Sequence, residues 1–160
     1  GATVIAVAGT PQKLALAAAH GADHGVLDGS DVAAQVRALT GGRGVDVVFD
    51  GVGKNSWESS LDSLKRRGLM ISFGNASGPV EGVNLGILAQ KGSLFVTRPT
   101  LAGYADTPER LQAMADELFG MIESGQLKVE ISNRYALKDA AAAQAALSAR
   151  QTTGSTVLLP

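Results

Sequence analysis

Cysteine is absent from this 160-residue sequence, and histidine occurs only twice. Without thiols the chain cannot form a disulfide framework or hold zinc or an iron–sulfur cluster through thiolates, and it fits a reducing compartment. The two histidines, His20 and His24, flank Asp23 but have no cysteine or second carboxylate nearby, which makes a poor metal site. We therefore expect a cytoplasmic protein with no metal site in this stretch.

A charge excess and a long apolar run are also missing. Lysine and arginine number 14 against 15 acidic residues, with the two signs interspersed, so a nucleic acid is an unlikely partner. No apolar run approaches the roughly 20 residues that cross a bilayer, so no membrane partner is expected. The first residues carry no leader-like features and already resemble a buried strand. This start predicts that the chain has been cut from something longer.

Short β-branched runs alternate with longer alanine-rich amphipathic segments, which is typical of βα units around a parallel sheet. The pattern predicts an α/β fold with a doubly wound parallel sheet of the Rossmann type. Strands are expected at 3–8, 24–27, 45–50, 68–73, 94–97 and 155–159. Helices are expected at 11–20, 30–39, 55–66, 108–124 and 138–149, with a polar crossover between the last two. Thr10, Ser30 or Asp31, and Asn55 or Ser56 are the expected N-caps.

The loop after the first strand is the most informative place for binding chemistry. Gly9 and Thr10 are small there, and no acid ends the strand to hold a ribose 2′-hydroxyl. Lys13 falls within the first turn of the following helix. A phosphate at this point would meet backbone N–H groups, a hydroxyl and an ammonium group. The alternative is an ordinary capped helix with a solvated lysine.

Two further glycine-containing turns follow predicted strands. Gly51-Val52-Gly53 comes after strand 45–50, but Ser56 replaces the third glycine of a dinucleotide fingerprint. We interpret this turn, like Phe73-Gly74-Asn75, as a place where a ligand approaches the backbone, with plain turn chemistry as the alternative. Asp50 has no accompanying catalytic partners, so we expect it to cap the turn rather than to act in catalysis.

Many short motifs match one known family, and they occur in the same order along nearly the whole chain. They lie at 9–13, 40–42, 50–53, 66–70, 72–75, 83–88, 91–94, 97–99 and 137–140. With these motifs the chain resembles the zinc-independent quinone oxidoreductases, the zeta-crystallin-like branch of the medium-chain dehydrogenase/reductase superfamily. Zinc independence is implied by this branch resemblance and not by the lack of cysteine.

The resemblance implies NADP(H) as the cofactor, with site residues in several loops. It places the adenosine 2′-phosphate at loop 9–13, with Arg150 closing over it, and segment 97–101 beside the nicotinamide amide. Where the branch often has a tyrosine on the adenine side, this chain has Asp28. An acid near the 2′-phosphate would weaken NADPH binding, unless the loop that carries it turns away from the phosphate. The implied cofactor-binding residues are Gly9, Thr10, Lys13, Gly51, Val52, Phe73, Gly74, Asn75, Ala76, Thr100 and Arg150. No side chain here is expected to be catalytic.

The resemblance also implies a longer, two-domain parent protein that reduces a small-molecule quinone by hydride transfer from NADPH. Residues 1–160 would be the NADP(H)-binding domain, incomplete at its N-terminus, with the first strand–helix unit and the catalytic domain before Gly1. This fragment alone is expected to be inactive. Family members join edge strands of two cofactor domains, and Leu94–Thr97 is apolar up to Arg98, so a homodimer through that strand is expected.

Two other functions remain open from the sequence. An enoyl reductase of the same superfamily would use the same cofactor loops to reduce a carbon–carbon double bond. A non-catalytic NADP(H)-binding structural or RNA-binding protein is the alternative from another class. The near-neutral charge argues against RNA.

Overall fold

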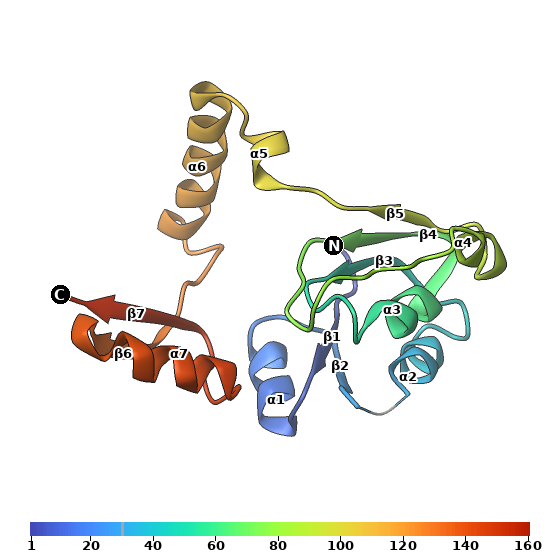
Figure 1. Ribbon diagram of the computed structural model, residues 1–160, viewed down its shortest axis with the longest axis horizontal. Coiled ribbons are helices and arrows are strands. Elements are labelled where there is room, and N and C mark those ends of the chain that lie inside the picture. The colour runs from blue at the N-terminus through green and yellow to red at the C-terminus, as the bar shows by residue number, and fades with distance from the viewer. Residues whose placement is uncertain (30) are drawn as a thin grey trace. The chain divides into compact units, whose positions relative to one another are not determined.

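The computed structural model describes residues 1–29 and 31–160, which form two compact units, Gly1–Thr100 and Leu101–Pro160 (Figure 1). The first unit contains β1 (Ile5–Ala8), α1 (Pro11–Ala19), β2 (His24–Leu27), α2 (Val32–Leu39), β3 (Val45–Asp50), α3 (Trp57–Ser63), β4 (Leu64–Ser72), α4 (Gly86–Gln90) and β5 (Phe95–Thr97). The second contains α5 (Leu101–Tyr104), α6 (Pro108–Glu123), β6 (Ile131–Ala136), the 3-10 turn η1 (Leu137–Asp139), α7 (Ala140–Ser148) and β7 (Ser155–Leu159).

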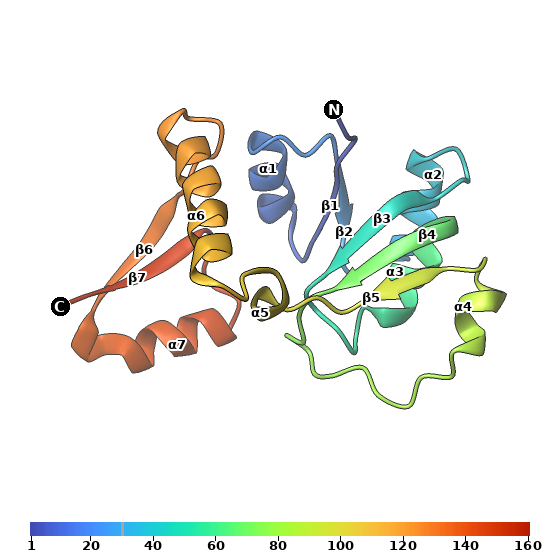
Figure 2. The same cartoon turned by 90° about the horizontal axis from the view of Figure 1, so that it is seen from above.

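All strand pairs in the described part of the chain are parallel. β1 pairs with β2, β3 with β4, β4 with β5, and β6 with β7. Figure 2 shows β3, β4 and β5 side by side and pointing the same way. The predicted α/β fold with parallel strands is therefore confirmed. Because the strands are parallel, the loops after β3, β4 and β5 all leave from one edge of the sheet.

The first two helices begin where the sequence predicts. The Thr10 hydroxyl accepts a hydrogen bond from the Lys13 backbone N–H at 3.2 Å and caps α1, which opens on Pro11. The Asp31 carboxylate accepts from the Ala34 backbone N–H at 3.0 Å and caps α2. Ser30, the other predicted cap, lies outside the described residues.

Two segments differ from the prediction. The helix expected at 55–66 ends at Ser63, because Leu64 already pairs with Val45 as the start of β4. The expected polar crossover contains β6, which pairs with β7. Ser132, Asn133 and Arg134 make β6 look like a loop in the sequence, although the pairing is regular over its last four residues.

One apolar cluster fixes the first unit around α3. Leu61, Leu64, Met70 and Leu94 are buried, and Trp57 packs against them together with other partly buried side chains. Each such burial contributes about 1.5–3 kcal/mol to folding. The cluster holds α3 against β3 and β4, so the turn between β3 and α3 is anchored at both ends.

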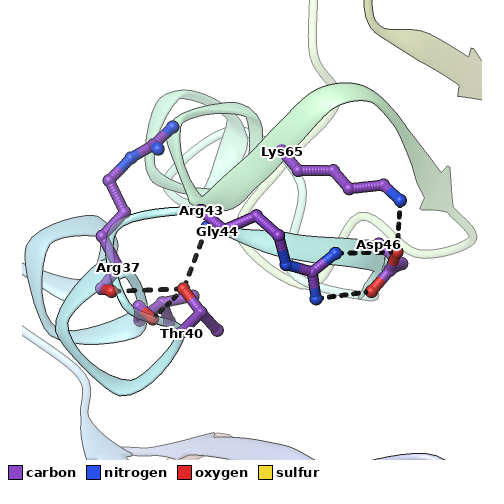
Figure 3. Close-up of polar contacts among 7 residues, drawn as sticks. Arg37, Thr40, Arg43, Gly44, Asp46 and Lys65 are labelled. Carbon is purple, nitrogen blue, oxygen red and sulfur yellow. Dashed lines mark hydrogen bonds and ion pairs between the residues drawn. The ribbon is translucent and has the colours of Figure 1, made fainter.

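Polar contacts secure the opposite, amino-terminal end of β3 (Figure 3). The Thr40 hydroxyl accepts a hydrogen bond from the Gly44 backbone N–H at 2.9 Å and donates to the Val36 carbonyl. Asp46 pairs with Arg43 at 3.1 Å and also with Lys65. Hydrogen bonds from Arg43 and then from Lys65 lower the pKa of Asp46 to about 2.

Arg37 links two elements in this region, and its loss should lower stability. Its guanidinium donates to the Asp62 carbonyl at 3.0 Å and to the Leu64 carbonyl at 3.1 Å, joining α2 to the α3–β4 junction. Arg37→Met should lower the free energy of unfolding by about 1.5–3 kcal/mol, because hydrogen bonds from a charged donor to part-buried carbonyls are lost. Urea unfolding of the full-length protein measures this effect.

Arg43→Met is the matched control, since its ion pair with Asp46 is exposed and exposed pairs contribute little. Equal losses from both substitutions would contradict the role given to Arg37.

Candidate functional site

The loops after β3 and β4 are joined into one platform, defined here as residues 51–55 and 73–78. The Ala76 N–H donates to the Gly51 carbonyl at 3.2 Å, and the Ser77 N–H donates to the Val52 carbonyl at 2.8 Å. The Ser77 hydroxyl donates to the same Val52 carbonyl, also at 2.8 Å. The structure thus brings together Gly51, Val52, Phe73, Gly74, Asn75 and Ala76, six of the residues predicted to bind a cofactor.

Glycine is required where these two loops touch. A Cβ on Gly74 would lie 2.3 Å from the Gly51 carbonyl oxygen, and a Cβ on Gly53 would lie 2.6 Å from the Gly78 carbonyl oxygen. Gly53 also has a φ of +89°, which side chains disfavour. At Gly51 a Cβ would lie 3.0 Å from the Phe73 ring, which is itself 55% exposed. The missing side chains therefore serve loop-to-loop contact within the platform.

Asp50 lies beneath the platform and is only 3% exposed. Its carboxylate accepts hydrogen bonds from the Val52 N–H at 2.8 Å and the Gly53 N–H at 2.9 Å. The hydroxyls of Ser56, at 2.7 Å, and Ser60, at 2.6 Å, donate to the same group. Burial would raise the pKa of Asp50, but these four donors outweigh it and hold the pKa below its usual value. The predicted turn-capping role of Asp50 is confirmed.

Arg98 lies in the segment 97–101 that was predicted beside the nicotinamide, but it was not named as a cofactor contact; in the structure it ties the platform to β5. Its guanidinium donates to the Ser72 carbonyl at 2.9 Å and to the Gly74 carbonyl at 3.0 Å. Thr100, which was predicted as a cofactor contact, follows two residues later. An arginine directly after a short apolar strand was the available signal, but the sequence does not say which carbonyls it contacts.

The loop from Gly9 to Lys13 follows β1 and forms a separate cluster of predicted residues. Open space surrounds the Cα of Gly9, since a Cβ there would meet nothing within 4 Å. Lys13 lies in the first turn of α1 after the Thr10 cap, as predicted. The Asp28 N–H donates to the Ala8 carbonyl at 2.9 Å, which places this acid beside the same strand end. The backbone of Lys13 and that of Asp28 therefore both lie near the carboxyl end of β1, next to the Thr10 hydroxyl.

Arg150, the remaining predicted residue, belongs to the second unit. It follows α7 and has a φ of 57°, an uncommon conformation for a side chain other than glycine. Its approach to the loop at Gly9–Lys13 stays a prediction.

The platform suits a dinucleotide better than a metal ion. Residues 1–29 and 31–160 contain no group of three or more His, Asp or Glu side chains that could hold a metal ion. Glycine-lined loops at the carboxyl edge of a parallel sheet are where this fold class binds dinucleotides. None of the described helices is long and apolar enough to span a bilayer.

Comparison with known proteins agrees with this geometry. Residues 1–119 match the family described as zinc-binding dehydrogenase. A quinone oxidoreductase of Pseudomonas aeruginosa is 59% identical over the whole chain and 50% of its own length. The crystal structure of Escherichia coli quinone oxidoreductase complexed with NADPH superimposes with a TM-score of 0.96 at 50% identity, covering all of this chain and 50% of that one.

A third relative is named for a substrate other than a quinone. A 2-haloacrylate reductase from a Burkholderia species is 39% identical over the whole chain and 49% of its own length. The chain therefore spans about half the length of the relatives it matches. The structural match also confirms the predicted Rossmann-type architecture.

Proposed function

Since the chain belongs to the zinc-binding dehydrogenase family, we propose that it is the NADP(H)-binding part of a longer, zinc-independent, NADPH-dependent quinone oxidoreductase. The observation that carries this proposal is the platform at the carboxyl edge of β3 and β4, with its glycine contacts and buried Asp50. The 59% identity to a quinone oxidoreductase supports the same reaction. NADPH, when bound, would supply the hydride that reduces the quinone.

The proposed domain is of the Rossmann type, residues 1–160, without its first strand–helix unit. The pairing supports this, since β1 pairs only with β2 and β3 only with β4 in sheets formed by the described residues. In the strand order 3-2-1-4-5-6 another strand lies between these two. We propose that this strand, the pyrophosphate-binding turn after it and the catalytic domain lie elsewhere in the full-length protein.

In this proposal the residues of the chain bind and orient the cofactor and exclude water, and none acts as nucleophile, acid or base. Lys13 and Arg150 provide positive charge to the adenosine 2′-phosphate, with Gly9 and Thr10 beside them. The nicotinamide half would contact Gly51, Val52, Phe73, Gly74, Asn75, Ala76 and Thr100. Correct placement of the two reactants accounts for most of the rate.

The test is NADPH oxidation by the full-length protein with a simple benzoquinone as acceptor. We expect steady-state turnover that needs both substrates and is faster with NADPH than with NADH. Tight NADPH binding without quinone-dependent oxidation would overturn the proposed reaction.

Reduction of a carbon–carbon double bond is the second candidate, and the 39% identity to a 2-haloacrylate reductase favours it. The same assay with 2-chloroacrylate in place of the quinone separates the two reactions. Retardation of RNA in a gel, without turnover of either substrate, would point instead to the non-catalytic alternative.

The partners we propose are a small-molecule quinone and a second copy of the protein. Support for the dimer comes from β5, whose outer edge pairs with no other strand of the described chain. Phe95, on this strand, is 60% exposed, and the segment Leu94–Thr97 carries no charge before Arg98. Apolar edges of this kind pair readily with another strand.

Phe95→Lys should convert the proposed dimer into monomers, because two added charges would lie near the joint. Sedimentation velocity of the full-length protein at micromolar concentration measures the change. Val129→Lys, at another exposed apolar position, is the control and should leave the dimer intact. A wild-type monomer, or a dimer that survives Phe95→Lys, would contradict this interface.

A further inference from the structure

We infer that Asp50 is a positioning residue for NADPH: its carboxylate fixes the turn Gly51–Gly53 and, through that turn, the whole platform in one binding-competent form. This inference rests on the proposed function, because it concerns the same cofactor site. Asp50 would not touch the reacting atoms, since its carboxylate is directed at the inside of the turn and at α3. Its effect on the cofactor would pass through the backbone above it.

The carboxylate gathers donors from three places along the chain. Val52 and Gly53 donate from the turn, Ser56 from the residue before α3, and Ser60 from one turn further into that helix. A buried carboxylate without partners is very unfavourable, so these four donors must be in place together. The arrangement couples the conformation of the turn to the position of α3, which the apolar cluster in turn fixes against the sheet.

The backbone of Asp50 extends this control to the loop after β4. Its carbonyl accepts a hydrogen bond from the Phe73 N–H at 2.8 Å. The carbonyls of Gly51 and Val52, oriented by the carboxylate, accept from Ala76 and Ser77. A single residue therefore sets both halves of the platform, and six predicted cofactor contacts depend on it.

A simple capping role would also use these hydrogen bonds, but it would affect only stability. Positioning predicts a further effect on cofactor affinity in protein that remains fully folded. It also predicts that the effect is uniform between about pH 6 and 9, because the hydrogen bonds keep the Asp50 pKa below its usual value and the group does not titrate there.

The experiment compares Asp50→Asn with Ser60→Ala in the full-length protein, measuring the Kd of NADPH by fluorescence titration well below each variant's unfolding temperature. Asp50→Asn should raise this Kd about tenfold or more, since one carboxylate oxygen becomes a donor that faces other donors. Ser60→Ala should raise it a few-fold, and this milder variant keeps the test decisive if Asp50→Asn does not fold. In both variants KM for NADPH should rise while KM for the quinone stays unchanged.

Ser63→Ala is the matched control, because Ser63 is a buried serine of the same helix, whereas Ser60 is partly buried, and Ser63 donates to the Ser59 carbonyl and not to Asp50. It should lower the unfolding temperature and leave the Kd of NADPH unchanged. Unchanged Kd values in Asp50→Asn or, if that variant does not fold, in Ser60→Ala would overturn the inference.

The wild-type protein separates this inference from the proposed function. If the wild-type protein binds NADPH but no quinone is reduced by it, the proposed reaction alone is overturned. The Kd comparison then still decides the role of Asp50. Wild type that does not bind NADPH overturns both.

Discussion

Lys13→Ala is expected to weaken NADPH binding to the full-length protein by about 1.5–3 kcal/mol, roughly 10- to 150-fold in Kd, with NADH almost unaffected. The reason is the 2′-phosphate, which only NADPH carries. Lys13 lies in the first turn of α1, where helix N–H groups and the Thr10 hydroxyl also favour an anion. Removing the ammonium group would eliminate a charge-assisted hydrogen bond to that phosphate. Isothermal titration with each cofactor measures the two affinities.

Lys128→Ala serves as the control, because Lys128 is an exposed lysine outside the predicted site. It should leave both affinities unchanged. Raising the salt concentration should reduce the advantage of NADPH in the wild type and have less effect in Lys13→Ala. Equal losses of NADPH and NADH affinity in Lys13→Ala would contradict the assignment of this loop to the 2′-phosphate.

The regular elements of the first unit were largely predictable from local pattern. Strands β2 and β3 have the predicted limits, and α1 begins at the predicted cap, because β-branched runs and capping residues act over a few neighbouring positions. The predicted boundary between α3 and β4 was wrong because of a contact between residues that are far apart in the sequence. Leu64 pairs with Val45 and is buried against Leu61 and Met70, and this tertiary contact overrides the continuing helical pattern.

Strand β6 was also missed by prediction from the local sequence pattern. Its residues Ser132, Asn133 and Arg134 are polar and do not show a buried strand's apolar run. Pairing with β7, some 20 residues later, makes this segment a strand. The composition of a short segment does not indicate which distant strand, here β7, will pair with it.

The platform loops were predictable from the sequence, but their contacts were not. Position after a strand pointed to Gly51-Val52-Gly53 and Phe73-Gly74-Asn75, because strand ends meet at one edge in any parallel sheet, and the family resemblance added Ala76. Their binding of a cofactor stays a prediction. The hydrogen bonds from Arg98 to carbonyls near the end of β4 needed the structure, since they depend on the placement of β5 beside β4. The same holds for Ser60, which becomes a partner of Asp50 only once α3 is placed.

Gly74→Ala is expected to have the largest effect on the platform, reducing both stability and NADPH affinity. The added Cβ would lie 2.3 Å from the Gly51 carbonyl oxygen and within 2.8 Å of two further backbone atoms of Gly51. The position of a Cβ is fixed by its own backbone and the atoms it meets belong to the Gly51 backbone, so no side-chain rotation relieves the contact and the two loops must separate. Overpacking of this kind costs about 1–3 kcal/mol in the free energy of unfolding. Separation would also strain the hydrogen bond from the Ala76 N–H to the Gly51 carbonyl and so disturb the surface that we propose binds the cofactor.

Gly9→Ala is the informative comparison, because a Cβ there meets nothing within 4 Å. It should leave the free energy of unfolding nearly unchanged while lowering NADPH affinity, since the added methyl group would lie where the phosphate is proposed to approach the backbone. Chemical denaturation and NADPH titration of both full-length variants give the four values needed. Gly74→Ala protein with wild-type stability and wild-type affinity would show that the two loops do not need their close contact at Gly51 to hold the cofactor.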